Sequence, residues 1–182
     1  YYPSVGGMED VVRNIASSQH ATGRQTASVV TLNRLFRNSG ELLDSHDIVD
    51  GVPVTRLPYR GSSRYPLCPS VLREINRADV VHVHGVDFFF DYLAATRLVH
   101  RRPLVVSTHG GFFHTEFASR LKEIWFRTIT RASSHAYERI VATSENDGHR
   151  FRDIVPDSRL EVIENGVNTD KYAGRGREEI NR

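Results

Sequence analysis

The second half of the chain alternates short continuous apolar runs with longer amphipathic stretches. Runs rich in Val, Ile and Leu that predict buried strands lie at 79–84, 103–108, 139–142 and 160–163. Stretches with helical spacing of apolar residues lie at 71–77, 88–99, 116–133 and from 145 onward. Strands that alternate with helices favour a mostly parallel sheet covered on both faces. The sequence therefore predicts a doubly wound α/β fold.

The first third of the chain predicts one helix and two further strands. Apolar residues from Met8 to Ala16 recur at helical spacing, and Gly23 would end that helix. β-branched runs at 27–32 and 52–57 predict strands. Pro53 suggests that the second of these lies at a sheet edge, because proline cannot donate to a ladder.

Composition narrows the class of protein. The chain has 182 residues, of which 39% are hydrophobic and 25% charged, a balance typical of a globular domain. Its longest apolar stretches fall well short of the roughly 20 residues of a membrane-spanning helix. The formal charge of +2 is too small to indicate nucleic-acid binding. The single cysteine, Cys68, cannot form an internal disulfide and favours a reducing, cytoplasmic setting.

Polar and glycine residues gather just after the predicted strands. In open α/β sheets ligands bind outside these carboxyl ends of the strands. The segments concerned are Gly6-Gly7 before the first helix, 82–85, 108–111 and 143–145. We expect them to form one binding edge.

Gly6 and Gly7 would let a phosphate or sugar hydroxyl approach the backbone at the start of a helix. The alternative is a plain turn with positive φ, which the pair alone favours. Glu9 and Asp10 would repel a dianion, so any phosphate contact here would come from backbone N–H groups.

His109 is the strongest single candidate for chemistry. It follows a buried strand and precedes two glycines, which leaves room for a ligand beside an imidazole that titrates near neutrality. The alternative is a histidine that only holds the loop. His84 and His82 lie at the end of the neighbouring strand without a carboxylate at a fixed spacing, so a metal site is disfavoured.

Ser144 and Asp147 fit an S-x-x-D capping arrangement, which is the favoured interpretation of that segment. The sequence contains no G-x-S-x-G, P-loop or G-x-G-x-x-G motif. Hydrolase, ATPase and ordinary dinucleotide-binding functions therefore lack their usual support.

The stretch 116–133 predicts a basic amphipathic helix that could lie on anionic lipid. Its cations are Arg120, Lys122, Arg127 and Arg131, and its apolar stripe is Phe117, Leu121, Ile124, Trp125, Thr128 and Ile129. The favoured alternative is that the stripe packs on the sheet, because any helix covering a parallel sheet needs one.

In their order, these motifs resemble the N-terminal half of retaining glycosyltransferases of family 4, which have the two-domain GT-B fold. The resemblance covers nearly all of residues 1–172, and each of its five pieces is loose alone. The pieces are Tyr2-Pro3 with Gly6-Gly7-Met8-Glu9, 78–84, Thr108-His109-Gly110, 142–145 and 162–168. Family members usually have a strand before the Tyr-Pro segment, which this sequence lacks.

The resemblance implies a Rossmann-like acceptor-side domain over residues 1–172. Residues 173–182 would be a linker or tail toward a C-terminal nucleotide-sugar domain that the sequence does not include. His109 would meet the transferred sugar as the catalytic residue. The cleft that binds the donor phosphates would include Gly6, Gly7, Gly110, Ser144 and Glu145, with His84 and Thr108 at its acceptor rim and Asn165 and Gly166 at the hinge.

The implied reaction transfers a sugar from a nucleotide sugar to a glycan, lipid or small-molecule acceptor with retention of configuration. It needs no metal or other cofactor, and the isolated domain would be inactive. The protein would be cytoplasmic, with peripheral contact to anionic membrane at most. Two alternatives stay open: a non-catalytic sugar or nucleotide binding module, and a GT-B-shaped sugar-phosphate enzyme such as an epimerase.

Overall fold

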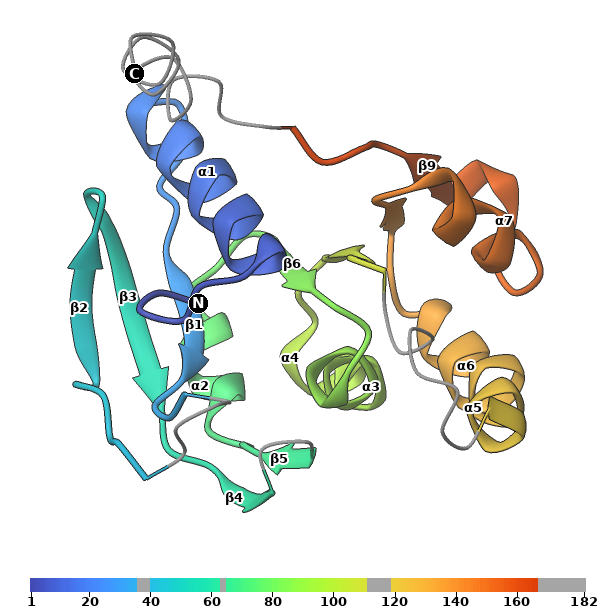
Figure 1. Ribbon diagram of the computed structural model, residues 1–182, viewed down its shortest axis with the longest axis horizontal. Helices are drawn as coiled ribbons and strands as arrows, with labels where there is room; N and C mark the ends of the chain where they lie inside the picture. Colours follow the sequence, from blue (N-terminus) through green and yellow to red (C-terminus); the bar gives the residue numbers. More distant parts are fainter. Residues whose placement is uncertain (36–39, 63–64, 111–118, 167–182) are drawn as a thin grey trace, which may run out of the picture.

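The structure is a computed structural model that describes residues 1–35, 40–62, 65–110 and 119–166 (Figure 1). The expectations for Gly111, for the helix start at 116–118 with Phe117, for Val167 and Asn168 and for the tail at 173–182 lie outside the described residues. No helix in the described part of the chain is long and apolar enough to cross a membrane.

A parallel sheet of four strands forms the second half, in the order β6-β7-β8-β9. The strands are β6 (Val81–His84), β7 (Leu104–Ser107), β8 (Arg139–Ala142) and β9 (Leu160–Val162). Their register pairs Val83 with Val106 and Val106 with Ile140, all three buried in the core. The predicted parallel sheet is therefore confirmed by its strand order and register, and β6, β7 and β8 contribute buried core residues.

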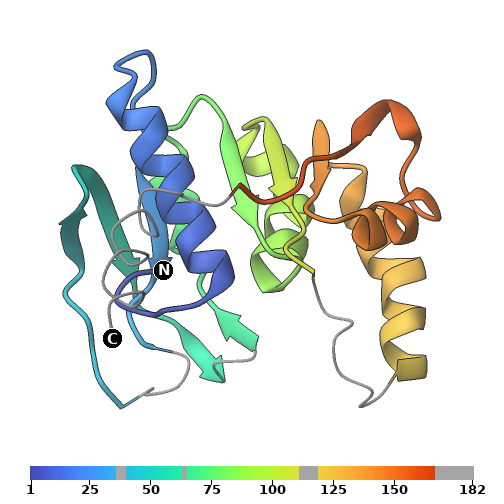
Figure 2. The same ribbon diagram turned by 45° about the horizontal axis from the view of Figure 1, so that its top comes forward.

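One helix precedes these strands, and the other helices and helical turns connect them (Figure 2). They are α2 (Val71–Ile75), α3 (Phe88–Ala95), α4 (Arg97–His100), α5 (Ser119–Trp125), the π-helical turn η2 (Phe126–Thr130), α6 (Arg131–Ser134), α7 (Glu145–Arg152) and the 3₁₀ turn η3 (Asp157–Arg159). The predicted helix over 88–99 is divided at Thr96, whose hydroxyl donates to the Tyr92 carbonyl at 2.7 Å. Tyr137 joins α3 to the core, because its hydroxyl donates to the Phe90 carbonyl at 2.9 Å.

The first third forms a separate three-stranded sheet beside α1 (Gly7–Ala21). Its strands are β1 (Val29–Leu32), β2 (His46–Val49) and β3 (Val52–Leu57). The order is β1-β3-β2, so β3 is central and the edge position predicted from Pro53 is wrong. The parallel ladder to β1 begins only at Val54, which leaves Pro53 outside it. A short hairpin follows, β4 (Arg60–Ser62) and β5 (Tyr65–Leu67).

The apolar stripe expected in the basic helix at 116–133 does not pack fully on the sheet, which was the favoured interpretation. Leu121, Ile124 and Ile129 are 65%, 60% and 42% exposed. The side that is buried carries Phe126 and Thr130 instead, one on each end of the π-helical turn. α6 packs against α3, where the Ser133 hydroxyl donates to Asp91 at 2.6 Å. The element therefore presents apolar side chains and cations to solvent together.

Candidate functional site

The ends of three neighbouring parallel strands are joined by side-chain hydrogen bonds. Nδ1 of His84, at the end of β6, lies 2.9 Å from Nε2 of His109, just after β7. The Thr143 backbone N–H, just after β8, donates to the Thr108 hydroxyl at 3.3 Å. The structure thus brings the predicted strand-end segments together along one edge.

The start of α1 lies beside the same edge. A β-carbon added to Gly85, which follows His84, would lie 3.5 Å from the sulfur of Met8 in the first turn of α1. The loop before the helix is held by Arg56 on β3, which is 3% exposed and donates to the Tyr2 carbonyl at 3.1 Å. Arg56 also pairs with Asp47 at 2.8 Å.

Gly6 and Gly7 do not form the positive-φ turn that the pair alone favoured. Gly6 is extended, with φ of −171°, and Gly7 is the first residue of α1. A β-carbon on Gly6 would meet the carboxylate of Glu9, and one on Gly7 would meet nothing within 4 Å. The space beside Gly7 is therefore unfilled, while the Glu9 carboxylate lies against Gly6 and would repel a phosphate there.

Three imidazoles form a row across the sheet edge. Ring centroids of His82 and His84 are 4.1 Å apart, and those of His84 and His109 are 5.2 Å apart. Nε2 of His82 lies 2.9 Å from the Ser107 hydroxyl. Burial lowers the pKa of His84 to about 3, with a smaller contribution from His82 and His109. The row is therefore uncharged near neutral pH.

His109 has an unusual backbone conformation, and only one of its two ring nitrogens has a described hydrogen-bond partner. Its φ of 50° lies in the left-handed region, which is uncommon for a residue with a β-carbon. Its Nδ1 is buried and has no hydrogen-bond partner within the described part of the chain. Burial lowers the pKa of His109, and the charge of Asp147 opposes that change. The ring therefore has one buried nitrogen without a hydrogen-bond partner in the described part of the chain, while its other nitrogen faces His84.

The Ser144 segment has the predicted cap. The Ser144 side chain accepts a hydrogen bond from the Asp147 backbone N–H at 3.2 Å, at the start of α7. Glu145 is exposed in the first turn. Ser144 is therefore occupied as a cap, and the predicted cleft roles of both residues stay predictions.

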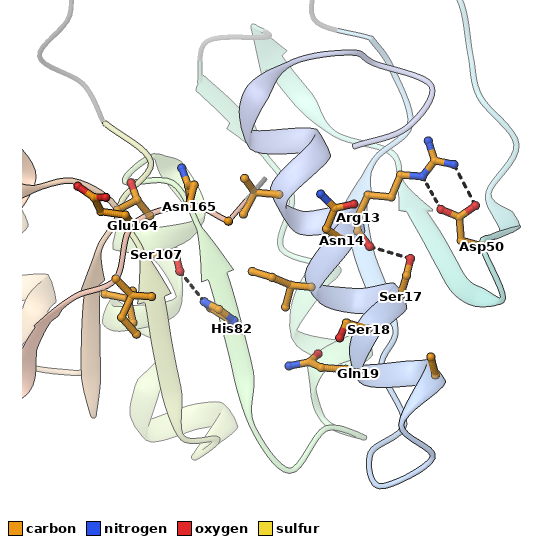
Figure 3. Close-up of a pocket in the computed structure, with 17 residues that line it drawn as sticks. Arg13, Asn14, Ser17, Ser18, Gln19, Asp50, His82, Ser107, Glu164 and Asn165 are labelled. Atoms are coloured by element: carbon orange, nitrogen blue, oxygen red, sulfur yellow. Dashed lines mark hydrogen bonds and ion pairs between the residues drawn. The ribbon is translucent and has the colours of Figure 1, made fainter. Parts of the chain in front are cut away.

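A pocket of about 880 Å³ lies between α1 and the sheet (Figure 3). Asn14, Ser18 and Gln19 of α1 lie across from His82, and Arg13 pairs with Asp50 on the other side of the helix. Asn165 and Gly166, the predicted hinge, line the same pocket after β9. The pocket also explains why Val11 and Ile15 of the predicted apolar stripe are only half-buried.

Two residues that support the site escaped the sequence analysis. Arg56 stands in a strand where its burial could not be read from the pattern. Asp147 was interpreted only within the capping motif, yet its carboxylate accepts hydrogen bonds from Thr108 and Gly110. Both residues act through contacts with distant parts of the chain, which the neighbouring sequence does not indicate.

The chain has a parallel sheet, and a glycine loop at a helix start lies beside the carboxyl ends of its strands. This arrangement is typical of a Rossmann-like α/β domain that binds its ligand at that edge. The chain belongs to Glycosyltransferase Family 4, which matches residues 5–171. This confirms the resemblance drawn from the five motifs, and with it the GT-B type of fold.

Close relatives share one described activity. The chain is 58% identical over 176 residues to a "GDP-mannose:cellobiosyl-diphosphopolyprenol alpha-mannosyltransferase" of Xanthomonas oryzae pv. oryzae (strain PXO99A), covering 97% of this chain and 46% of the relative. It is 51% identical over 172 residues to a protein of the same description from Komagataeibacter xylinus, covering 94% and 43%. The chain spans about half the length of the curated relatives it matches.

Proposed function

We propose that this chain is the N-terminal, acceptor-side lobe of a retaining mannosyltransferase that uses GDP-mannose and a lipid-linked oligosaccharide acceptor. Family membership and relatives that are 51–58% identical support the transferase over a binding module or an epimerase. The observation that carries the proposal is His109, whose buried Nδ1 is unpartnered among the described residues at the edge where strand ends meet the α1 glycines.

In the proposed reaction the bond from the anomeric carbon of mannose to the β-phosphate oxygen of GDP breaks. A bond from that carbon to the acceptor hydroxyl oxygen forms on the same face. The acceptor proton passes to a phosphate oxygen of the leaving GDP, so no enzyme nucleophile is needed. The proposal includes no metal ion or other cofactor, since the nucleotide sugar is a substrate.

We propose that the half-buried ring of His109 contacts the mannosyl group, and that binding brings its unpartnered Nδ1 to the sugar. Because its pKa is lowered by burial, the ring is neutral at pH 7 and acts by hydrogen bonding. With Nε2 facing His84, the tautomer of this pair decides whether Nδ1 donates or accepts. Backbone N–H groups of Gly6 and Gly7 would face the donor phosphates without adding charge.

A lipid-linked acceptor lies in a membrane. One surface of the lobe carries the exposed apolar and cationic side chains that bind to membranes. We define the α5–α6 face as Arg120, Leu121, Ile124, Arg127 and Arg131, all of them exposed. Apolar side chains beside cations favour binding to anionic lipid, with about 1 kcal/mol for each cation near the surface. We propose that this face holds the protein at the cytoplasmic side of the membrane.

Product analysis tests the proposed reaction. The full-length protein is incubated with cellobiosyl-diphosphopolyprenol and, separately, GDP-mannose, GDP-fucose, UDP-glucose and ADP-glucose. We expect product only with GDP-mannose, and a one-bond C1–H1 coupling in its NMR spectrum that identifies the α-mannoside. A β-linked product would contradict retention, and transfer from another donor alone would contradict the assigned substrate.

A further inference from the structure

One buried carboxylate holds the loop that carries His109. The Thr108 hydroxyl donates to Oδ2 of Asp147 at 2.7 Å, and the Gly110 backbone N–H donates to the same oxygen at 2.8 Å. Asp147 is 5% exposed and Thr108 is fully buried. The two hydrogen bonds therefore hold the loop at the residue before His109 and at the residue after it.

The loop needs such support because its conformation is unusual. His109 and Gly110 are both left-handed, with φ of 50° and 76°. Glycine adopts this region without steric cost, but a residue with a β-carbon does not. A strained residue at a functional site persists only where its surroundings determine its conformation. Here the surroundings are the carboxylate of Asp147 and the imidazole of His84.

The position of Asp147 is itself fixed by packing of α7. Its backbone N–H is bonded to the Ser144 cap, and the next residue, Gly148, lies against β9. A β-carbon on Gly148 would come within 2.6 Å of Cγ2 of Val162. The close approach of α7 to the sheet thus brings the Asp147 side chain within reach of the strand-end loop.

We propose that Asp147 is a positioning residue that directs the His109 imidazole toward the transferred sugar. The inference rests on the proposed function, in which His109 touches the sugar and Asp147 does not. Asp147 acts through the two loop hydrogen bonds, and its negative charge adds a second effect on the ring. Among the described residues, the titratable groups that interact with the His109 ring are His84 and His82 from β6 and Asp147 from α7, and the charge of Asp147 raises the pKa that burial lowers.

A double-mutant cycle in the full-length protein tests this role, with mannose transfer from GDP-mannose as the readout. Asp147→Ala is expected to lower kcat about tenfold or more, with a smaller change in KM, because the lost interaction belongs to the transition state. In a His109→Ala background the same substitution should change kcat less than about twofold, since residues that act as a unit are not additive. Asp153→Asn, at the exposed end of α7, is the matched control.

Asp147→Asn separates the hydrogen bonds from the charge and covers the case in which the alanine variant does not fold. Its amide oxygen can accept from both Thr108 and Gly110, so most of kcat should be retained. NMR titration of ¹³C-labelled histidine should show a lower pKa for His109 than in the wild type. An unchanged His109 pKa together with full loss of kcat would contradict the proposal.

Hydrogen exchange adds a readout that does not depend on turnover. The Gly110 amide should be protected in the wild type and in Asp147→Asn, and it should exchange about tenfold or more faster in Asp147→Ala. An active wild type with additive losses in the cycle would overturn the positioning role alone. A wild type that transfers no mannose, with a protected Gly110 amide, would overturn the proposed function and the positioning role with it.

Discussion

Protonation of one buried residue, His84, should affect the stability of the lobe. Its folded-state pKa is about 3, against an ordinary value of 6.5, because burial disfavours the charged ring. The unfolded chain therefore binds more protons between these two values. The free energy of unfolding should fall as pH falls through this window, and it should become insensitive to this group about one pH unit above 6.5.

The consequence is measurable by urea unfolding of the full-length protein at several pH values, followed through this lobe by hydrogen exchange. Between pH 6.5 and pH 5 the group should cost on the order of 1–2 kcal/mol of stability. His84→Asn removes the titrating ring and should flatten that part of the pH profile. Equal slopes in the wild type and the variant would show that His84 does not carry the effect.

His109 tests the proposed contact with the sugar. His109→Ala should lower turnover of the full-length protein at least about tenfold, equivalent to about 1.4 kcal/mol of transition-state stabilisation. The melting temperature should change little, because the half-buried ring leaves the core intact. Unchanged turnover in a folded variant would remove His109 from the reaction.

The sequence was enough to place Thr108, His109 and Gly110 at the carboxyl edge of the sheet. It was not enough to predict which residue holds them there. Thr108, His109 and Gly110 follow a run of buried residues, so their place at the carboxyl edge could be derived from the pattern alone. Asp147 lies 37 residues beyond Gly110 in the sequence, and only the packing of α7 on β9 brings the two together. Their functional roles stay predictions.

Helix α7 depends on a close contact between Gly148 and β9. Gly148→Ala places a β-carbon within 2.6 Å of the stiff side chain of Val162. Overpacking of this kind costs about 1–3 kcal/mol, which exceeds the gain of up to about 1 kcal/mol in helix propensity. We expect a lower melting temperature of the full-length protein, partly restored by Val162→Ala.

Gly40→Ala is the control for that change, because a β-carbon there would meet nothing within 4 Å. A Gly148→Ala variant as stable as this control would mean that α7 does not pack on β9 as described.

The α5–α6 face is tested by sedimentation of the full-length protein with lipid vesicles. Binding should occur with vesicles that contain phosphatidylglycerol at low salt, and it should weaken toward about 0.5 M salt, where screening is short-ranged. Leu121→Asp with Ile124→Asp should abolish it, because both side chains are exposed and apolar. Leu98→Asp, at an even more exposed position on α4, is the control. Equal binding to neutral phosphatidylcholine vesicles would contradict an electrostatic attachment.

The pattern of apolar residues predicted the positions of most helices and strands. It did not predict everything that packs against them. The strand at 139–142 was predicted with its observed bounds, because it is a continuous run between polar residues. β2 was missed because it is mostly exposed, although Asp50-Gly51 is a favoured two-residue hairpin turn and both residues have positive φ. The stripe with Leu121 and Ile124 was assigned to the core because periodicity shows that a helix has an apolar face and does not show what covers it.

The whole molecule requires two lobes for catalysis, according to the proposed function. The chain covers 46% of the Xanthomonas oryzae relative and 43% of the Komagataeibacter xylinus relative. Preorganised charge around a leaving diphosphate and closure over the donor need a complete cleft. Titration calorimetry of residues 1–182 alone with GDP-mannose should therefore show dissociation constants in the millimolar range, about 4 kcal/mol of binding. Micromolar binding would place the donor site within this chain.

The most direct test is transfer of radiolabelled mannose from GDP-mannose to cellobiosyl-diphosphopolyprenol by the purified full-length protein, followed by extraction of the lipid product. We expect label in the lipid fraction, and this label should depend on both the acceptor and His109. Residues 1–182 alone should incorporate none. Full-length protein that binds GDP-mannose but transfers no label to the lipid, or an isolated chain that transfers it alone, would contradict the assignment of this chain as the acceptor-side lobe of a mannosyltransferase.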